Sequence, residues 1–251
     1  MLDPVPDVAT PTWKVPALAT LLGVIVVPIF AWRLALGADG SGFDDRGVVL
    51  ALAALQAAIA VLLAARGRTD ANARPWLLVA AACVAWGASH PAQLSDDRTA
   101  TIAFNAGFAL FVAMVACGVV SFGARAADRD ARRKLILDLV SPVVALLVLT
   151  WLVLVGPYVL NDGAGGQMKT TAVVHGAGAI VLLVLGLAGP LSRRGGEPGA
   201  PPRALLAGVG SIALGDGLWL QRWIDGASRI NLLAELCFAS GFLLVAFSAL
   251  R

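Results

Sequence analysis

The stretch ALLAGVGSIALGDGLWLQRWIDGASRINLLAELCFASGFLLVAFSAL, residues 204–250, decides the fold: two apolar segments flank a short polar tip at residues 221–229. Each apolar segment is close to the roughly 20 residues that a helix needs to cross a bilayer. Asp216 lies inside the first segment and Glu235 inside the second. An ionised carboxylate at bilayer depth costs a few kcal/mol, so each acid predicts a partner, a bound ligand, a water-filled cavity or a proton.

The composition extends this pattern to the whole chain. Hydrophobic residues occupy 59% of the 251 positions and charged residues 14%, whereas soluble domains have roughly 45–50% and about 25%. We therefore expect an all-α, polytopic membrane helical bundle, because lipid-exposed backbone must satisfy its own hydrogen bonds. The apolar windows predict about eight transmembrane helices, at residues 15–37, 48–65, 76–91, 101–123, 136–160, 170–190, 204–221 and 230–250.

This reading gives a cytoplasmic N-terminal tail at residues 1–14 and a single transmembrane helical domain at residues 15–251. The first span is expected to stay in the membrane, since no Lys or Arg precedes Lys14 and the apolar stretch has no small-residue cleavage pattern.

The basic residues predict the orientation. They fall in alternate loops, and the loops between these are acidic or nearly neutral. By the positive-inside rule the basic loops are cytoplasmic. We therefore expect both termini in the cytoplasm and the chain in the cell membrane. This topology accounts for the formal net charge of +3, so we expect no nucleic-acid partner. The basic residues in alternate loops are Arg66, Arg68, Arg74, Arg125, Arg129, Arg132, Arg133, Lys134, Arg193, Arg194 and Arg203.

The predicted orientation brings several polar side chains into the outer half of the bilayer. His175 and Glu235 lie within about two turns of the outer surface, and Asp216 lies over halfway up an outward-running span. Trp219 follows Asp216 by three residues and shares its helix face. We expect an outward-facing pocket for a small ligand, lined by Asp216, Glu235, His175, Trp219, Arg222 and Arg33.

A purely structural role stays open for the same residues. Asp216 could pair with Arg222 or Arg33, and such an ion pair would only fix helix register. Arg33 could also extend its charged end to the membrane surface. His90, at the outer end of its span, is expected to be hydrated, and Asn105 is expected to form hydrogen bonds between helices.

An internal repeat is a further prediction. Trp76–Val120 and Leu205–Leu250 both read as an apolar span with a late glycine, a polar tip and a span containing Gly-Phe. A parallel four-plus-four duplication would explain this, although Ala/Leu/Val-rich sequence also resembles itself by chance.

Catalytic motifs are not found in the sequence. The two histidines, His90 and His175, lack the His-x-x-x-His and His-Glu-x-x-His spacings of zinc sites. The Gly-rich loops lack the Lys-Ser/Thr of a phosphate-binding loop, and no Gly-x-Ser-x-Gly elbow occurs. We therefore expect no enzymatic activity, no cofactor and no metal. The single cysteines inside the spans predict neither a disulfide nor a metal cluster; they are Cys83, Cys117 and Cys237.

Several short motifs resemble a known family. Residues 45–251 are similar, in the same order, to the N-terminal multi-span membrane region of actinobacterial proteins with GGDEF and EAL domains, which make and degrade cyclic di-GMP. The motifs are Arg74-Pro75-Trp76, Val84-Ala85-Trp86-Gly87, Leu137-Asp138-Leu139-Val140, Trp151-Leu152-Val153-Leu154-Val155-Gly156-Pro157-Tyr158 and Leu214-Gly215-Asp216-Gly217-Leu218-Trp219.

The resemblance implies a sensory role in cyclic di-GMP signalling. The chain departs from the family by having Gly87-Ala88 where the family often has Gly-Asp, which weakens a paired-acid site, and by containing no GGDEF motif. It would then be the membrane part of a longer protein or a free-standing relative.

Three functions remain as hypotheses. The first is a sensory, ligand-binding membrane module with an unknown small ligand at its outer face, and the alternatives are a small transporter or proton-coupled carrier and a membrane enzyme acting on lipid. The expected partners are membrane lipids, a cytoplasmic signalling domain or protein, and a second copy of the chain in a homodimer.

Overall fold

The computed structural model describes residues 46–66, 68, 70–94, 97–123, 129–160, 165–191, 202–225 and 230–250. The predicted N-terminal tail and the predicted first span at 15–37 lie outside the described residues.

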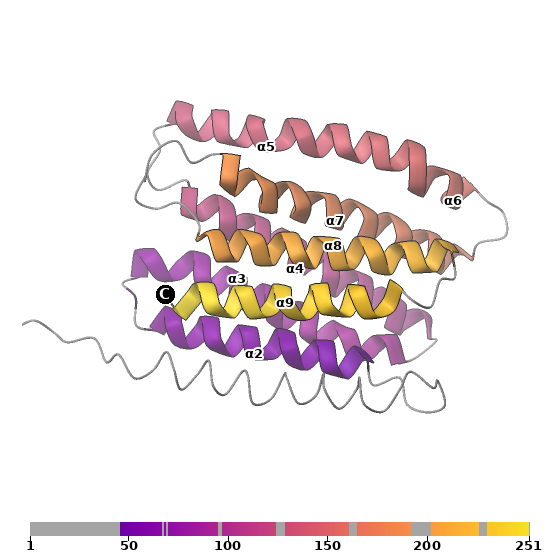
Figure 1. The fold of residues 1–251 in the computed structure, drawn as a ribbon, viewed down its shortest axis with the longest axis horizontal. Coiled ribbons are helices and arrows are strands. Elements are labelled where there is room, and N and C mark those ends of the chain that lie inside the picture. The colour runs from indigo at the N-terminus through magenta and orange to yellow at the C-terminus, as the bar shows by residue number, and fades with distance from the viewer. Residues whose placement is uncertain are drawn as a thin grey trace, which may run out of the picture. The chain divides into compact units, whose positions relative to one another are not determined.

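Every regular element in the described part of the chain is helical, and the seven later predicted spans each coincide with a helical segment (Figure 1). The all-α prediction is therefore confirmed for these residues. In chain order the elements are α2 (Arg46–Arg66), α3 (Asp70–Ser89), the 3₁₀ turn η1 (His90–Leu94), α4 (Arg98–Gly123), α5 (Arg129–Thr150), the π-helical segment η2 (Trp151–Val155), α6 (Gly156–Leu160), α7 (Gly166–Leu191), α8 (Arg203–Asp225) and α9 (Ile230–Leu250).

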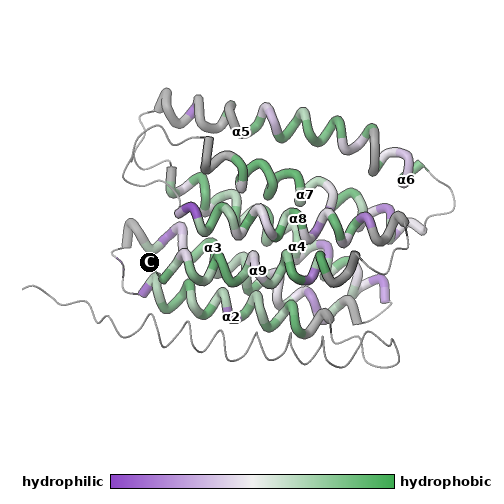
Figure 2. The backbone as a smooth tube through the Cα atoms, in the orientation of Figure 1, coloured by the Kyte–Doolittle hydropathy of each residue, from purple (hydrophilic) through white to green (hydrophobic). Residues whose placement is uncertain are grey.

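Five of the described helices are long and apolar enough to cross a membrane: Val49–Arg66, Arg98–Phe122, Gly166–Leu187, Arg203–Gln221 and Leu233–Leu250. Figure 2 shows apolar residues along most of their length and hydrophilic residues mainly toward the ends. The chain is a multi-pass membrane protein. In α5 the apolar part is shorter, Val140–Thr150, because the helix begins with the charged residues of its first turns.

The described helices pack as a closed ring with one helical segment outside it. Going round the ring, α2 packs against α3, α3 against α4, α4 against α7, α7 against α8, α8 against α9, and α9 again against α2. The run of α5, η2 and α6 packs mainly against α7 and lies beside the ring (Figure 1).

Aromatic side chains from opposite parts of the ring meet around Trp86 of α3. Its indole is fully buried and lies 4.8 Å from the Phe242 ring and 5.3 Å from the Phe238 ring, both of α9, between ring centroids. Phe111 of α4 contacts both Trp86 and Phe242. The interior of the ring is thus filled by aromatic side chains.

Small residues allow a close helix contact between α8 and α9. A Cβ atom placed on Gly241 would lie 2.5 Å from Ile212 Cγ1 and 2.9 Å from the Gly208 carbonyl oxygen. Close backbone approach at small residues is how helices associate in lipid, where apolar burial gives little driving force. The α8–α9 hairpin that the sequence predicts is therefore held by backbone contact at these glycines.

We expect Gly241→Val to lower the free energy of unfolding by about 1–3 kcal/mol, the usual cost of overpacking. Thermal unfolding in detergent measures it. Gly217→Ala is the matched control, because a Cβ atom there meets nothing within 4 Å and alanine should add about 0.5–1 kcal/mol to a helix. Equal effects of the two substitutions would contradict the close α8–α9 contact.

The π-helical segment η2 has a local cause. Pro157 lacks a backbone N–H and would clash with a carbonyl of the preceding turn in a regular α-helix. The Gly156 N–H instead bonds to the Trp151 carbonyl oxygen, five residues earlier, and a Cβ atom on Gly156 would lie 2.5 Å from that oxygen. Gly156-Pro157 therefore specifies the wider turn.

The end of α9 is tied to the turn between α2 and α3. Arg68 Nη2 donates a hydrogen bond to the Ala249 carbonyl oxygen at 2.7 Å, and its guanidinium carbon lies 4.5 Å from the centroid of the Trp76 ring. Partial burial lowers the pKa of Arg68, whose guanidinium stays charged at neutral pH. A cation at a helix C-terminus caps the last carbonyls and is favoured by the helix dipole.

Candidate functional site

A buried polar contact joins α7 to α8. His175 Nδ1 lies 2.7 Å from Asp216 Oδ1, and each residue is only 1% exposed. His175 is nine residues beyond Gly166 and Asp216 is nine residues before Asp225, so both lie about 14 Å along their helices from that end. Both residues lie within the apolar, membrane-length parts of these helices, Gly166–Leu187 and Arg203–Gln221.

Aromatic rings of α4 and α8 enclose the imidazole of His175. The Phe108 ring stacks on it with centroids 4.0 Å apart and planes 12° apart, and the Phe104 ring stacks at 4.8 Å and 20°. Trp219 of α8 lies 4.9 Å from the imidazole, between centroids. Gly178 makes this packing possible, because a Cβ atom there would lie 2.3 Å from an atom of the Phe108 ring.

Two further polar side chains belong to the same cluster. His90 of η1 is 4% exposed and lies 3.6 Å from the Trp86 ring and 5.4 Å from the Phe104 ring between centroids, and the same Phe104 ring stacks on His175. Asn105 of α4 donates a hydrogen bond from Nδ2 to Thr171 Oγ1 at 3.0 Å. Since Thr171 is one turn from His175 on α7, this bond borders the imidazole.

Four polar atoms of this cluster have no protein hydrogen-bond partner. They are His90 Nδ1, Asn105 Oδ1, His175 Nε2 and Asp216 Oδ2. A buried polar atom left unpaired costs about 1–3 kcal/mol, so a cluster of them is uncommon in a structure that serves packing alone. We call the side chains of His90, Asn105, His175 and Asp216 the polar cluster.

The His175–Asp216 pair could release or take up a proton at His175 Nε2. With one proton in the Nδ1–Oδ1 hydrogen bond and another on Nε2, the pair carries no net charge, and loss of the Nε2 proton leaves one negative charge. A net charge in such apolar surroundings costs more than a neutral pair. The unpaired Nε2 and Oδ2 atoms are where a proton or a hydrogen-bonding ligand would bind.

The structure brings together three of the six predicted site residues: His175, Asp216 and Trp219. Glu235 lies half-buried on α9, whereas the polar contact of Asp216 is with α7. Arg222 belongs to α8, but its side chain lies outside the described residues, as does Arg33. The predicted partners of Asp216 were arginines, and the partner found is a histidine.

The prediction of a hydrated His90 is wrong, because the residue is buried against Trp86. Its position four residues after Trp86 on one helix face was the signal that could have revealed this contact. The prediction for Asn105 is confirmed by its hydrogen bond from α4 to α7. Within the described residues, no group of three or more His, Cys, Asp or Glu side chains is placed to hold a metal ion.

Comparisons with protein-family models, with curated proteins and with solved structures find no match to this chain. The geometry of the polar cluster is therefore the observation from which a function can be argued.

Proposed function

We propose that this chain is an integral membrane sensory module whose polar cluster binds a small polar ligand and transmits the event to the cytoplasm. The observation that carries the proposal is the buried His175–Asp216 pair, with Nε2 and Oδ2 both unpaired inside an aromatic enclosure. A structure that only needed to join α7 to α8 could do so with apolar side chains, which is often neutral or stabilising. The polar pair therefore indicates a use beyond packing.

The route of the signal in this proposal is the α8–α9 hairpin. Asp216 lies on α8, and Ser211 of α8 donates a hydrogen bond to the Cys237 carbonyl oxygen of α9 at 2.8 Å. The far end of α9 is held by Arg68 through the Ala249 carbonyl. A shift of α8 would therefore move α9 against the α2–α3 turn.

The finer topology is part of the proposal. It comprises eight spans, both termini in the cytoplasm and a place in the cell membrane, with cyclic di-GMP signalling as the downstream process that the family resemblance implies. The proposed four-plus-four duplication is supported by the order of the ring, α2–α3–α4 followed by α7–α8–α9. It is also supported by the shared pattern Phe-x-x-Gly-Phe at residues 104–108 of α4 and 238–242 of α9.

Ligand binding should raise the unfolding temperature of the purified chain. The probes are acetate, ammonium, glycine and imidazole in turn, each at a concentration far above its dissociation constant. A probe at a hundred times that constant adds about 2.7 kcal/mol, which is about 5–10 °C for a chain of this size. Asp216→Asn should abolish the shift, and Asp97→Asn, an exposed carboxylate before α4, should retain it. Equal shifts in both variants would refute binding at the polar cluster.

A proton-coupled carrier is the second candidate, and it is favoured by the burial of the pair inside the apolar parts of two membrane-length helices. Ionisable residues buried inside membrane-spanning helices often mark the proton or ion path of pumps and transporters. Purified chain in liposomes with a pH-sensitive dye inside would separate the two candidates. Proton flux that Asp216→Asn removes identifies a carrier, whereas a thermal shift without flux identifies a sensor.

A further inference from the structure

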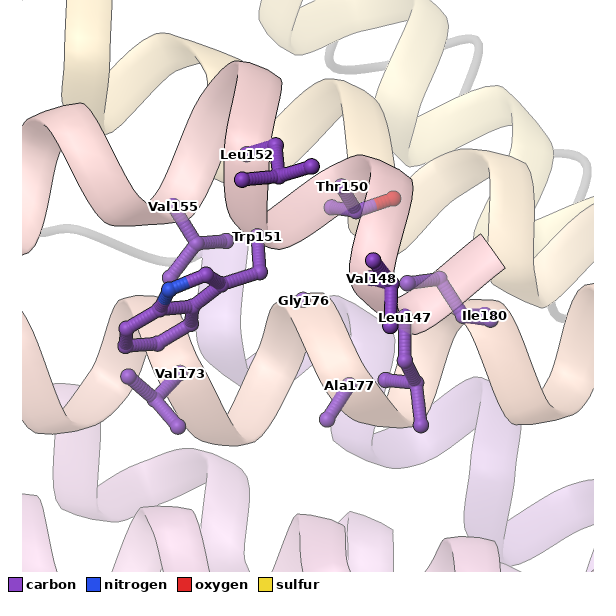
Figure 3. Close-up of a pocket in the computed structure, with 10 residues that line it drawn as sticks. All are labelled: Leu147, Val148, Thr150, Trp151, Leu152, Val155, Val173, Gly176, Ala177 and Ile180. Atoms are coloured by element: carbon purple, nitrogen blue, oxygen red, sulfur yellow. The ribbon is translucent and has the colours of Figure 1, made fainter. Parts of the chain in front are cut away.

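A second candidate site lies on the outside of the ring, between α7 and the run of α5 and η2. It is a groove with a cavity volume of ≈ 320 Å³. Figure 3 shows the ten residues that line it, all apolar apart from the Thr150 hydroxyl and the indole N–H of Trp151. No charged side chain lines it, so its chemistry suits a hydrocarbon ligand and not a headgroup.

The groove opens toward the surroundings of the protein. Val148, Trp151 and Leu152, on its α5–η2 side, are 54%, 46% and 67% exposed. On α7 it runs from Val173 to Ile180, about 10–21 Å from the start of the helix at Gly166. At that depth the surroundings of a spanning helix are lipid tails, since the hydrocarbon core is about 30 Å thick. The groove is thus continuous with the lipid-facing surface.

The wall of the groove is shaped by the π-helical segment and its glycine contacts. The Gly156–Trp151 hydrogen bond fixes the wide turn that presents Trp151 and Val155 to α7. Val155 packs directly against α7 at Gly176, where an added Cβ atom would lie 3.1 Å from Val155 Cγ2. π-helical turns often occur at functional sites, and this one packs against α7 at Gly176, the residue after His175.

We propose that this groove binds one acyl chain of a bilayer phospholipid. Its volume is at the lower end of the about 300–1,000 Å³ of small-molecule sites, which fits part of a single chain. A helix of a second copy is about 10–12 Å across, so such a groove would admit only one or two of its side chains. The proposal is independent of the function proposed for the polar cluster.

A photoreactive lipid tests the site. The chain is reconstituted in nanodiscs of phosphatidylcholine with a small fraction carrying a diazirine in one acyl chain, irradiated and mapped by peptide mass spectrometry. We expect label on residues 147–155 and 173–180 that saturates at one lipid per chain and is displaced by unlabelled phosphatidylcholine. Label that rises linearly with lipid content, and equally at Leu214 and Leu233 on other lipid-exposed surfaces, would overturn the proposal.

Filling the groove provides the matched comparison. Ala177 lines the groove, so Ala177→Phe should reduce the groove label at least fivefold. If Ala177→Phe does not fold, Ala177→Leu is used in its place and should reduce the label to a smaller extent. Leu149→Phe places the same phenyl ring at a 56% exposed position of α5 outside the groove and should leave the label unchanged. Unchanged label in the Ala177 variants, or disulfide-linked dimers of Leu152→Cys that exclude the lipid label, would show that the groove is not a lipid site.

Discussion

His175→Leu is expected to lower the free energy of unfolding by about 3–5 kcal/mol, the usual cost of breaking a buried ion pair. Leucine has no hydrogen-bonding atoms, so the substitution leaves Asp216, only 1% exposed, without its 2.7 Å contact to the imidazole. The carboxylate must then be buried unpaired, take up a proton or draw water into the aromatic enclosure. Each of these outcomes costs stability.

The double variant His175→Leu/Asp216→Leu should be more stable than His175→Leu alone, because it removes both polar partners together. Replacing a buried pair by apolar residues of similar volume is often neutral or stabilising. A double-mutant cycle of the unsubstituted chain, the two single variants and the double variant should therefore give a large coupling energy, beyond the 0.5–3 kcal/mol of ordinary neighbouring residues. A loss of ligand response or proton flux in the stable double variant would then report function without a folding defect.

Unfolding in detergent, monitored by circular dichroism, measures the free energies of unfolding that the cycle compares. His90→Leu is the control, because His90 is similarly buried but its Nδ1 has no hydrogen-bond partner, whereas His175 Nδ1 contacts Asp216. It should cost clearly less than His175→Leu. If the two single substitutions cost the same and the double variant is additive, the His175–Asp216 contact contributes nothing specific, and the polar cluster loses its central pair.

The sequence predicted which segments are helical but not which helices pack against each other. Apolar segments of about 20 residues with polar breaks must be helical in a bilayer, and the seven spans predicted between 48 and 250 appear as helical segments. Which helices touch depends on side-chain packing that hydropathy does not encode. The contact between α4 and α7, on which the enclosure of His175 rests, could not be read from hydropathy.

The candidate site was predicted in part for the same reason. A buried acid requires a partner, so Asp216 could be singled out, and helical spacing correctly placed Trp219 beside it. The choice among possible partners depends on which helix lies opposite, and α7 places His175 there. His90 was misjudged because its position near the end of a span indicates water, whereas η1 packs it under Phe104 and Trp86.

Trp86→Ala should lower the free energy of unfolding by about 3 kcal/mol, the lower end of the range for large aromatic residues in cores. The indole of Trp86 lies at the contact of α3 with Phe238 and Phe242 of α9 and also covers His90. In lipid the loss comes mainly from missing packing contacts, because transfer from water contributes little between helices. Such a cavity cannot be filled without moving α3 or α9.

Trp151→Ala is the matched control for this substitution. It removes the same side chain from a position that is 46% exposed on the lipid-facing side of η2, where lipid tails can occupy the vacated space. Its cost should therefore be small. Thermal unfolding of the two variants in the same nanodiscs distinguishes the cases, and Trp86→Phe should recover much of the loss because a ring still contacts Phe242.

Trp86→Phe and Trp151→Ala also test whether the aromatic interior of the helix ring holds the polar cluster in place. His90 stacks on Trp86 at 3.6 Å between centroids and also contacts Phe104, which stacks on His175. If the aromatic filling holds the polar cluster in place, Trp86→Phe should fold normally yet weaken the thermal response to ligand, whereas Trp151→Ala should leave that response intact. A full response in Trp86→Phe would mean that α7 and α8 alone position the His175–Asp216 pair, and that the aromatic interior serves only stability.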